Sequence, residues 1–281
     1  MKDLPILIIG KNGKTGARVD QRLQSLGYAT RPVSRSTAPS FDWEDPATWE
    51  SAIKGTRSAY VTYQPDLAVP RAEATIKSFV RVAAEAELEH MVLLSGRGEE
   101  GAQRAEDVLI SSGIPWNIVR CSWFNQNFSE NFMLEGILAG ELVLPATDTL
   151  EPFVDADDIA DVAVATLTDP RHRNKLYELT GPRALNFAQC IEEVSEALGR
   201  PVKYTPVPLN DYINALREQG VSEDYQWLLR ELFTVVFDGR NSNVMTGVEE
   251  ALGRSATDFK AYVQKTIGSG AWNTTTNPNV G

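Results

Sequence analysis

Apolar runs alternate with amphipathic segments from residue 4 to about residue 180. The first run, Leu4–Ile9, is almost wholly apolar, which is typical of a strand buried in a parallel sheet. The segment after Gly16 instead places Val19, Leu23 and Leu26 on one face of a helix. Further strands are predicted at 28–33, 41–43, 58–62, 91–94, 115–120 and 175–180, and helices at 69–86, 99–112 and 155–167. This alternation predicts an α/β fold with a doubly wound parallel sheet of Rossmann type.

From Asn186 onward the pattern changes to helices with little strand character. We expect this part to form a smaller, mostly helical substrate domain, made of about 123–150 plus 183–268. The cofactor-binding domain then comprises 1–122 plus about 151–182. The last segment, 269–281, is rich in Asn, Thr and Gly and is predicted to be a loose tail. Within the second domain, helices are predicted at 187–198, 209–219 and 222–237, two shorter helices before 267, and one small strand at 202–207.

A glycine turn follows the first predicted strand, with Gly10, Gly13 and Gly16 at a spacing of three. Strand, glycine turn and helix in this order form a dinucleotide-binding fingerprint, here GxxGxxG in place of GxGxxG. Gly10 would make the tight turn, Gly13 would let a pyrophosphate reach the backbone, and Gly16 would let the helix pack on the sheet. An ordinary βα turn is the alternative, and the flanking strand and helix favour a nucleotide. We predict cofactor contacts from the whole turn: Gly10, Lys11, Asn12, Gly13, Lys14, Thr15 and Gly16.

The end of the second predicted strand indicates which nicotinamide cofactor is bound. A fold that selects NAD usually has an acid there to hold the ribose hydroxyls, and no acid occurs between Tyr28 and Phe41. Ser34, Arg35 and Ser36 instead offer a guanidinium and two hydroxyls, which suit a 2′-phosphate. The alternative is a solvated loop arginine. The sequence therefore predicts NADP(H), preferred over NAD(H).

Polar and aromatic residues at the ends of the later predicted strands are candidates for the rest of the cofactor. Carboxyl ends of parallel strands line the crevice in which a cofactor lies. Asp42 and Trp43 would recognise the adenine, although Trp43 fits a core residue nearly as well. Thr62 and Tyr63 would lie on the nicotinamide side. Ser95 and Tyr63 are the candidate catalytic residues, since the Ser95 hydroxyl would meet a substrate carbonyl or imine.

Aromatic and amide side chains are interleaved in the stretch 123–138, which we expect to be helical. Such a stretch forms either a core-packing helix or a flat, apolar substrate wall with a few amides for orientation. With Gln64, which follows a predicted strand, and Phe153, which precedes the predicted helix at 155–167, the candidate substrate contacts are Gln64, Trp123, Phe124, Asn127, Phe128 and Phe153. Farther on, the acids Asp155, Asp157, Asp158 and Asp161 cluster at a helix start, where they complement the helix dipole rather than bind a metal.

The composition is that of an ordinary globular protein, with 42% hydrophobic and 23% charged residues in 281. A formal net charge of -11 argues against a direct nucleic-acid partner. The chain enters the first predicted strand without a leader, and no apolar run is long enough to span a membrane, so we expect a cytoplasmic protein without membrane contact.

Cys121 and Cys190 lie far apart, and His90 and His172 stand alone, which gives no metal-binding spacing. Cys121 is predicted to be a small core residue, and a homodimer is left open.

Four motifs together resemble one known family. They are Ser95–Gly98, Ser112–Arg120, Ser122–Phe128 and Phe153–Ala163, and of these the Trp-Phe-Asn block within Ser122–Phe128 is the more discriminating. The chain resembles, over roughly residues 4–265, the NmrA-like branch of the atypical short-chain dehydrogenase/reductases. In particular it is similar to the NAD(P)H-binding reductases that include the fungal festuclavine dehydrogenases. The resemblance implies a Rossmann-type oxidoreductase that acts on a small molecule.

One feature of ordinary short-chain dehydrogenases is missing, namely the Tyr-x-x-x-Lys pair in which the tyrosine serves as the acid. No tyrosine of this chain has a lysine four positions later, and Tyr262 with Lys265 is one position short. Two hypotheses remain. An activated electrophile such as an iminium, quinone or azo compound needs only to be held against NADPH. Alternatively, the protein binds NADP(H) without turnover and acts as a redox sensor through a protein partner, as some NmrA-like proteins do.

Overall fold

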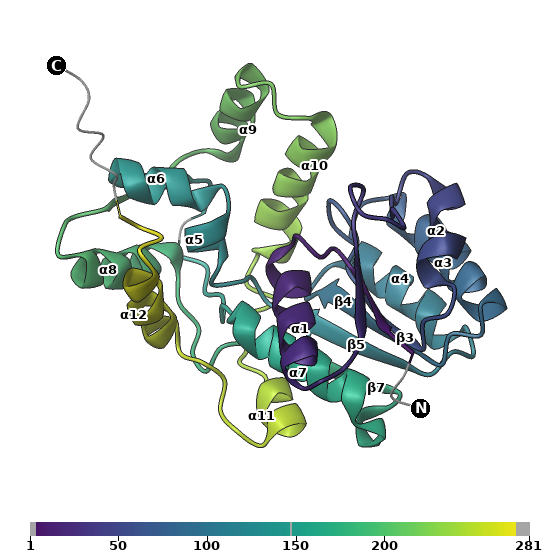
Figure 1. The fold of residues 1–281 in the computed structure, drawn as a ribbon. Helices are drawn as coiled ribbons and strands as arrows, with labels where there is room; N and C mark the ends of the chain where they lie inside the picture. The colour runs from purple at the N-terminus through teal and green to yellow at the C-terminus, as the bar shows by residue number, and fades with distance from the viewer. Residues whose placement is uncertain (1–3, 147, 274–281) are drawn as a thin grey trace, which may run out of the picture.

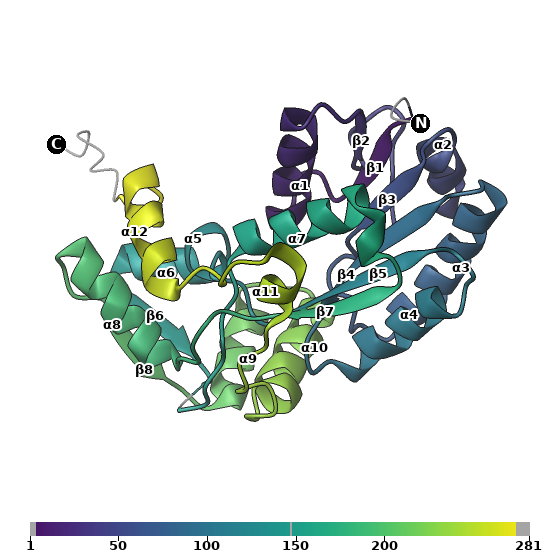
Figure 2. The ribbon, with the colours of Figure 1, turned by 90° about the horizontal axis from the view of Figure 1, so that it is seen from below.

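The computed structural model describes residues 4–146 and 148–273. A six-stranded parallel sheet, with strand order β2-β1-β3-β4-β5-β7, runs through the larger part of the molecule (Figures 1 and 2). The strand order reverses between β1 and β3, which is the topological switch point at which ligands bind in such sheets. The predicted doubly wound α/β fold is confirmed. The strands are β1 (Ile6–Ile9), β2 (Thr30–Val33), β3 (Ser58–Val61), β4 (His90–Gly96), β5 (Trp116–Cys121) and β7 (Lys175–Leu179).

Helices cover both faces of the sheet, and an apolar layer packs them against it on each face; these two layers together form the first core (Figure 2). On one face lie α2 (Trp49–Ile53), α3 (Ala72–Glu85) and α4 (Glu100–Ile110), and on the other α1 (Lys14–Ser25), α7 (Ala156–Thr168) and α11 (Gly247–Leu252). The apolar stripe of α3, for example Ile76 and Phe79, is fully buried against the sheet. Helix α11 lies in the segment that we expected in the substrate domain, yet it packs on α7 and β7 through Val248.

The predicted strand at 41–43 is absent: an isolated bridge between Asp42 and Asp45 stands in its place. Side chains take up the backbone groups that a strand would pair. The Asp42 carbonyl accepts the indole N–H of Trp49 at 2.7 Å, and the Asp42 N–H donates to Thr48 Oγ1 at 3.0 Å. A predicted helix start nearby is present, since the Asp45 side chain caps a 3₁₀ turn, η1 (Pro46–Thr48).

A second core lies beside the sheet and is rich in aromatic rings, such as Phe187 packed on Phe237 with centroids 5.1 Å apart. One strand, β6 (Glu141–Leu144), was not predicted, and it pairs in parallel with the predicted strand β8 (Lys203–Pro206). The division of the chain into two domains itself stays a prediction. The helices here are α5 (Asn127–Glu130), α6 (Met133–Ala139), α8 (Phe187–Leu198), α9 (Leu209–Glu218), α10 (Glu223–Glu231) and α12 (Phe259–Ser269), and α10 continues into a π-helical turn, η3 (Leu232–Val236). A short 3₁₀ turn, η2 (Pro170–His172), precedes β7.

The described part of the predicted tail is anchored, contrary to the expectation of a loose segment. Trp272 is 2% exposed and its indole N–H donates to the Phe128 carbonyl at 2.8 Å. Its ring also meets Tyr262 edge-on. The large apolar ring therefore holds 269–273 against the second core, and the remainder of the predicted tail, 274–281, lies outside the described residues.

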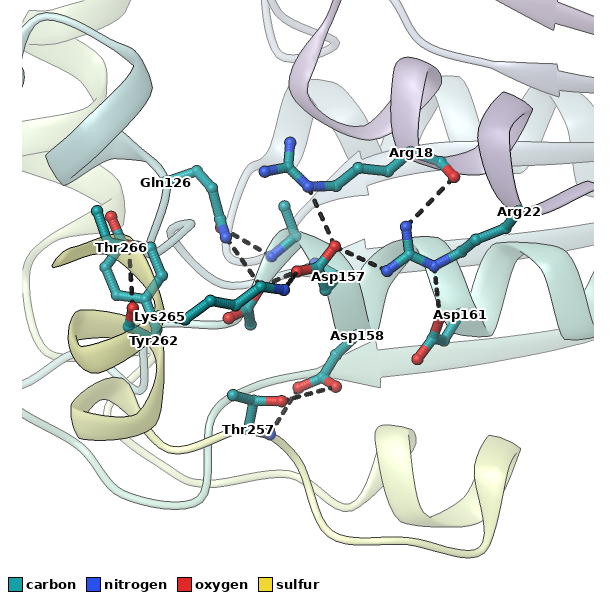
Figure 3. A network of polar contacts seen from close by, with 12 residues as sticks. Arg18, Arg22, Gln126, Asp157, Asp158, Asp161, Thr257, Tyr262, Lys265 and Thr266 are labelled. Carbon is teal, nitrogen blue, oxygen red and sulfur yellow. Dashed lines mark hydrogen bonds and ion pairs between the residues drawn. The ribbon is translucent and has the colours of Figure 1, made fainter. Parts of the chain in front are cut away.

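The acidic start of α7 connects distant parts of the chain (Figure 3). Asp157 pairs with Arg22 of α1 at 2.7 Å and with Lys265 of α12, and Asp161 also pairs with Arg22, at 2.6 Å. Although burial opposes ionisation, the hydrogen bonds from Lys265 and Arg22 lower the pKa of Asp157 to about 2. The acids that we expected to complement the helix dipole thus also join α1 and the C-terminal segment to α7. Across residues 4–146 and 148–273, no helix has the length and apolar character that a membrane span requires.

Candidate cofactor and substrate site

The glycine turn between β1 and α1 is too crowded for side chains at two of its three glycines. Gly10 has a φ of +85°, and a Cβ there would overlap Thr62 Oγ1. A Cβ at Gly16 would overlap the Gly10 carbonyl oxygen and come within 2.8 Å of its carbon. Gly13 is the N-cap of α1, and no side chain among the described residues caps that start. The first-turn N–H groups of α1 are therefore free to meet an anion.

A cavity of about 660 Å³ opens beside this turn, and we call it the turn cavity. Arg35 lies exposed at its rim between Ser34 and Ser36, and it has no hydrogen bond or ion pair with any described residue. The free amides, the guanidinium and the hydroxyls together fit a phosphorylated dinucleotide. Of the predicted cofactor residues, Gly10, Asn12, Gly13, Ser34, Arg35, Ser36, Asp42, Trp43 and Thr62 line this cavity. The predicted contacts Lys11, Thr15 and Gly16 line neither this cavity nor its neighbour. Thr15 and Gly16 lie on the buried side of the first turn of α1, and the Lys11 N–H donates to the Val33 carbonyl of β2.

A second cavity, of about 270 Å³, lies between the carboxyl ends of the central strands and α10; we call it the inner cavity. Pro65, which follows β3, lines both cavities, so the two meet there. Helix α10 and the turn after it contribute an apolar wall of Tyr225, Leu228, Leu229 and Leu232. The inner cavity is thus apolar on one side and bounded by polar strand ends on the other.

Half of the predicted substrate residues line the inner cavity, namely Trp123, Phe124 and Asn127. Phe128 and Phe153 do not: they are 0% and 2% exposed and pack on each other with centroids 5.4 Å apart. The prediction assumed one helix from 123 to 138, whereas α5 begins at Asn127, so Phe124 and Phe128 do not share a helical face. Gln64 lines the turn cavity instead of the inner one.

The two predicted catalytic residues line the inner cavity but are already engaged. The Ser95 hydroxyl donates to Glu106 Oε1 at 2.5 Å, so its proton is directed away from the cavity. The Tyr63 ring lies 4.9 Å from that of Trp43, and its hydroxyl is 3.4 Å from Thr75 Oγ1 in α3. Both hydroxyls are therefore engaged by neighbouring side chains, that of Ser95 by Glu106 and that of Tyr63 by Thr75.

Lys14 connects the glycine turn to the inner cavity. Its ammonium donates to Asn127 Oδ1 at 3.2 Å, so the start of α1 is tied to the start of α5. Burial lowers the pKa of Lys14, while the nearby Glu130 opposes this effect. Lys14 therefore lies in the lining of the inner cavity, between the glycine turn and the start of α5.

Two acids that the sequence patterns did not single out, Asp66 and Glu99, also line the inner cavity. They follow the carboxyl ends of the adjacent strands β3 and β4. Their carboxyl groups are hydrogen-bonded to each other, and burial raises the pKa of both, that of Glu99 well above its ordinary value. The sequence contains one signal that could have identified these two acids, namely their position after the carboxyl ends of two neighbouring strands.

The sequence profile of the NmrA-like family matches residues 2–266. The chain belongs to the NmrA-like family. Three characterised relatives cover nearly the same span. Prestalk A differentiation protein A of Dictyostelium discoideum is 27% identical over 95% of this chain and 87% of its own length. An NAD(P)H azoreductase of Xenophilus azovorans is 27% identical over 92% and 96%, and a festuclavine dehydrogenase of Aspergillus fumigatus is 27% identical over 91% and 96%. The predicted resemblance is confirmed.

Solved structures of two reductases and of a transcriptional regulator share the fold. The triphenylmethane reductase of Citrobacter sp., solved with NADP(H), superposes with a TM-score of 0.78 at 19% identity, over 93% of this chain and 99% of its own. An NADPH-dependent quinone oxidoreductase of Escherichia coli, solved with NADPH, gives the same TM-score, identity and coverage. NmrA, a negative transcriptional regulator, superposes with a TM-score of 0.70 at 16% identity, over 95% and 98%.

Proposed function

We propose that this NmrA-like protein is an NADPH-dependent reductase that transfers hydride to a flat, apolar, activated electrophile of the imine, quinone or azo type. The observation that carries the proposal is the junction of the two cavities at Pro65, beside the switch point of the sheet. A cofactor that extends through the turn cavity would present its reactive end to the inner cavity. NADPH supplies the hydride, and the protein supplies binding, orientation and exclusion of water.

Each part of the site has a role in this proposal. The glycine turn and the free amides of α1 bind the pyrophosphate, and Arg35 with its neighbouring serines binds the 2′-phosphate. Tyr63 lies on the nicotinamide side. Trp123, Phe124 and the leucines of α10 would hold a flat acceptor by apolar contact, and Asn127 would orient it. The azoreductase and dehydrogenase relatives support this class of chemistry.

The test is oxidation of NADPH by the purified protein against a panel of quinones, azo dyes, cyclic imines and aliphatic aldehydes. We expect turnover of at least one flat electrophile, read as loss of NADPH absorbance. Aliphatic aldehydes should show little activity, because they lack the flat apolar surface that the cavity wall would bind. If the protein binds NADPH and reduces nothing in the panel, the reductase assignment fails.

Cofactor preference rests on Arg35. Arg35→Ala should weaken NADPH binding by about 10- to 100-fold, because a charge-assisted phosphate contact contributes about 1.5–3 kcal/mol, while NADH binding should change little. Titration of intrinsic fluorescence with each cofactor measures both affinities. Arg31→Ala is a matched control on β2, since Arg31 donates to the carbonyls of Ala52 and Lys54 and does not line the turn cavity. Equal losses for both cofactors in Arg35→Ala would contradict the assignment.

The second candidate function is a redox sensor without turnover. The structural likeness to NmrA, a negative transcriptional regulator, favours the sensor function. A sensor should bind NADP(H) with normal affinity and leave the whole acceptor panel unreduced. It should also bind a partner protein differently in the presence of oxidised and reduced cofactor.

A further inference from the structure

The inner cavity contains a pair of carboxyl groups in an unusual environment. Glu99 is 7% exposed, and the Glu99 and Asp66 carboxyls are hydrogen-bonded to each other. Glu99 Oε2 is enclosed by protein and receives no N–H or hydroxyl donor from the described residues. Two ionised carboxylates cannot hydrogen-bond, so a pair in this arrangement holds a proton. The pair lies in the wall of the cavity that would hold the acceptor.

The backbone is shaped around this pair. A Cβ at Gly96, the last residue of β4, would overlap Glu99 Oε2 and lie 2.7 Å from Oε1, so the carboxyl folds back onto the strand end where only glycine leaves room. The Asp66 side chain is held by the Ala68 N–H, which donates to Oδ1 at 2.8 Å. Asp66 thus acts as the fixed acceptor and Glu99 as the group that carries the proton.

The charges around Glu99 favour the acid form. Besides Asp66, the acids Glu106 of α4 and Glu231 of α10 face it, and all three disfavour ionisation of Glu99. The cations that line the cavity are engaged elsewhere, Arg97 by Glu178 and by two backbone carbonyls and Lys14 by Asn127. Arg240, which reaches the Gly98 carbonyl, pairs with Asp238. Burial and these acids raise the pKa of Glu99 well above its ordinary value, so the acid persists toward neutral pH.

We infer that Glu99, held by Asp66, is the proton donor of the reduction, and that the acceptor is a neutral electrophile of the quinone or azo type. This inference rests on the proposed reductase function. Reduction of a quinone adds one hydride, which NADPH supplies with its electron pair, and one proton. Hydride transfer alone gives the hydroquinone anion. The O–H bond of Glu99 then breaks and a new O–H bond forms at the quinone oxygen, which gives the neutral hydroquinone with no further proton. NADP⁺ and the Glu99 carboxylate remain, and solvent returns a proton to the pair through the open cavity.

The decisive experiment compares acceptors that differ in their need for a proton. A benzoquinone and an azo dye must gain a proton, whereas a triarylmethyl cation becomes neutral by accepting hydride alone. In Glu99→Gln, which keeps the shape and the hydrogen bond to Asp66, we expect the kcat for quinone and azo dye to fall about 100-fold, at the lower end of general-acid effects. The rate with the cation should stay within about threefold. Glu100→Gln, an exposed neighbour, should match the wild type with every acceptor.

The pH dependence supplies a second test. Ionisation removes the donor, so the wild-type rate with quinone should decline as pH rises through the raised pKa of the pair, and the rate with the cation should not. Asp66→Asn removes the partner charge that disfavours ionisation, so the decline should move to lower pH. This variant also keeps the inference testable if Glu99→Gln fails to fold.

Infrared spectroscopy of the resting protein provides a readout that needs no turnover. The wild type and Glu100→Gln should show the carbonyl stretch of a protonated carboxyl at neutral pH, and Glu99→Gln should lack it. If this band is absent from the wild type, or if Glu99→Gln slows quinone and cation equally, the proton-donor role is overturned while the reductase function stands. A wild type that reduces no acceptor at all overturns the reductase function and the donor role together.

Discussion

Gly16→Val is expected to abolish measurable NADPH binding and to lower the free energy of unfolding by about 3 kcal/mol, the upper end for an overpacked site. A Cβ at this position meets the carbonyl carbon and oxygen of Gly10, and both atoms are backbone, so no side chain can rotate aside. The turn has to open, and the first N–H groups of α1 move with it. Urea denaturation measures the loss of stability, and fluorescence titration with NADPH measures the loss of binding.

Two other glycines make the test specific. A Cβ at Gly268 in α12 would have no neighbouring atom within 4 Å, so Gly268→Ala should leave NADPH binding unchanged and stabilise the protein by up to about 1 kcal/mol. A Cβ at Gly13 would lie 3.2 Å from the Gly10 oxygen, so Gly13→Ala should fold with little loss but bind NADPH more weakly, since the methyl group faces the turn cavity. Wild-type affinity for NADPH in Gly16→Val would contradict this account of the turn.

The sheet and its switch point could be predicted because buried parallel strands are apolar on both faces. β1, β3 and β4 are short apolar runs between helices, and nothing competes with that pattern. The wrong strand at 41–43 shows the limit. The C=O and N–H of Asp42 are paired by the Trp49 indole and the Thr48 hydroxyl. Such contacts cannot be predicted from the local sequence pattern.

The smaller half of the molecule was harder to predict for a related reason. β6 has four residues and is stabilised by pairing with β8, about 60 positions farther along the chain, so its own sequence carries little signal. The sequence around Phe128 is as compatible with a substrate wall as with a core. The structure distinguishes the two, because the helix around Phe128 begins only at Asn127. An aromatic stripe alone does not distinguish the two roles.

The cofactor-binding part of the site could be predicted because a sequence motif constrains its backbone. The acid pair could not, because its chemistry depends on burial. The glycine turn and the position of Arg35 follow from strand, turn and helix in sequence. Asp66 and Glu99 are ordinary acids in the sequence. Their chemistry arises because two adjacent strand ends bring them together under α10, out of water. Only the fold brings the two carboxyl groups together as a pair.

Behind Ser95, a buried ion-pair network holds the strand ends that build the inner cavity. Glu106 of α4 is 1% exposed and is bound by two nitrogens of Arg120 in β5, with Nε donating to Oε1 at 3.0 Å. Arg120 also pairs with Glu178 of β7 at 2.7 Å. The hydrogen bonds that Arg120 donates to both acids raise its pKa, so the guanidinium stays charged. The network therefore joins α4, β5 and β7 directly beneath the site.

Arg120→Met should lower the free energy of unfolding by about 3–5 kcal/mol, because Glu106 would be left as a buried charge without its cation. Urea denaturation measures the change, with Arg104→Met as the matched control. Arg104 lies on the exposed side of α4, the helix that carries Glu106, and pairs with Glu73 of α3 at 3.1 Å. A solvated pair of this kind contributes about 1 kcal/mol or less.

The double variant Arg120→Met with Glu106→Gln separates the cost of the orphaned charge from the loss of packing. The substituted side chain is an uncharged amide whose oxygen would still accept the Ser95 hydroxyl, so the double variant should recover more than half of the stability lost in Arg120→Met. If Arg120→Met and Arg104→Met cost the same, or if neutralising Glu106 restores nothing, then the network does not stabilise the strand ends. In that case the position of Ser95, and of the Glu99 carboxyl on the neighbouring turn, must depend on backbone packing at Gly96 alone.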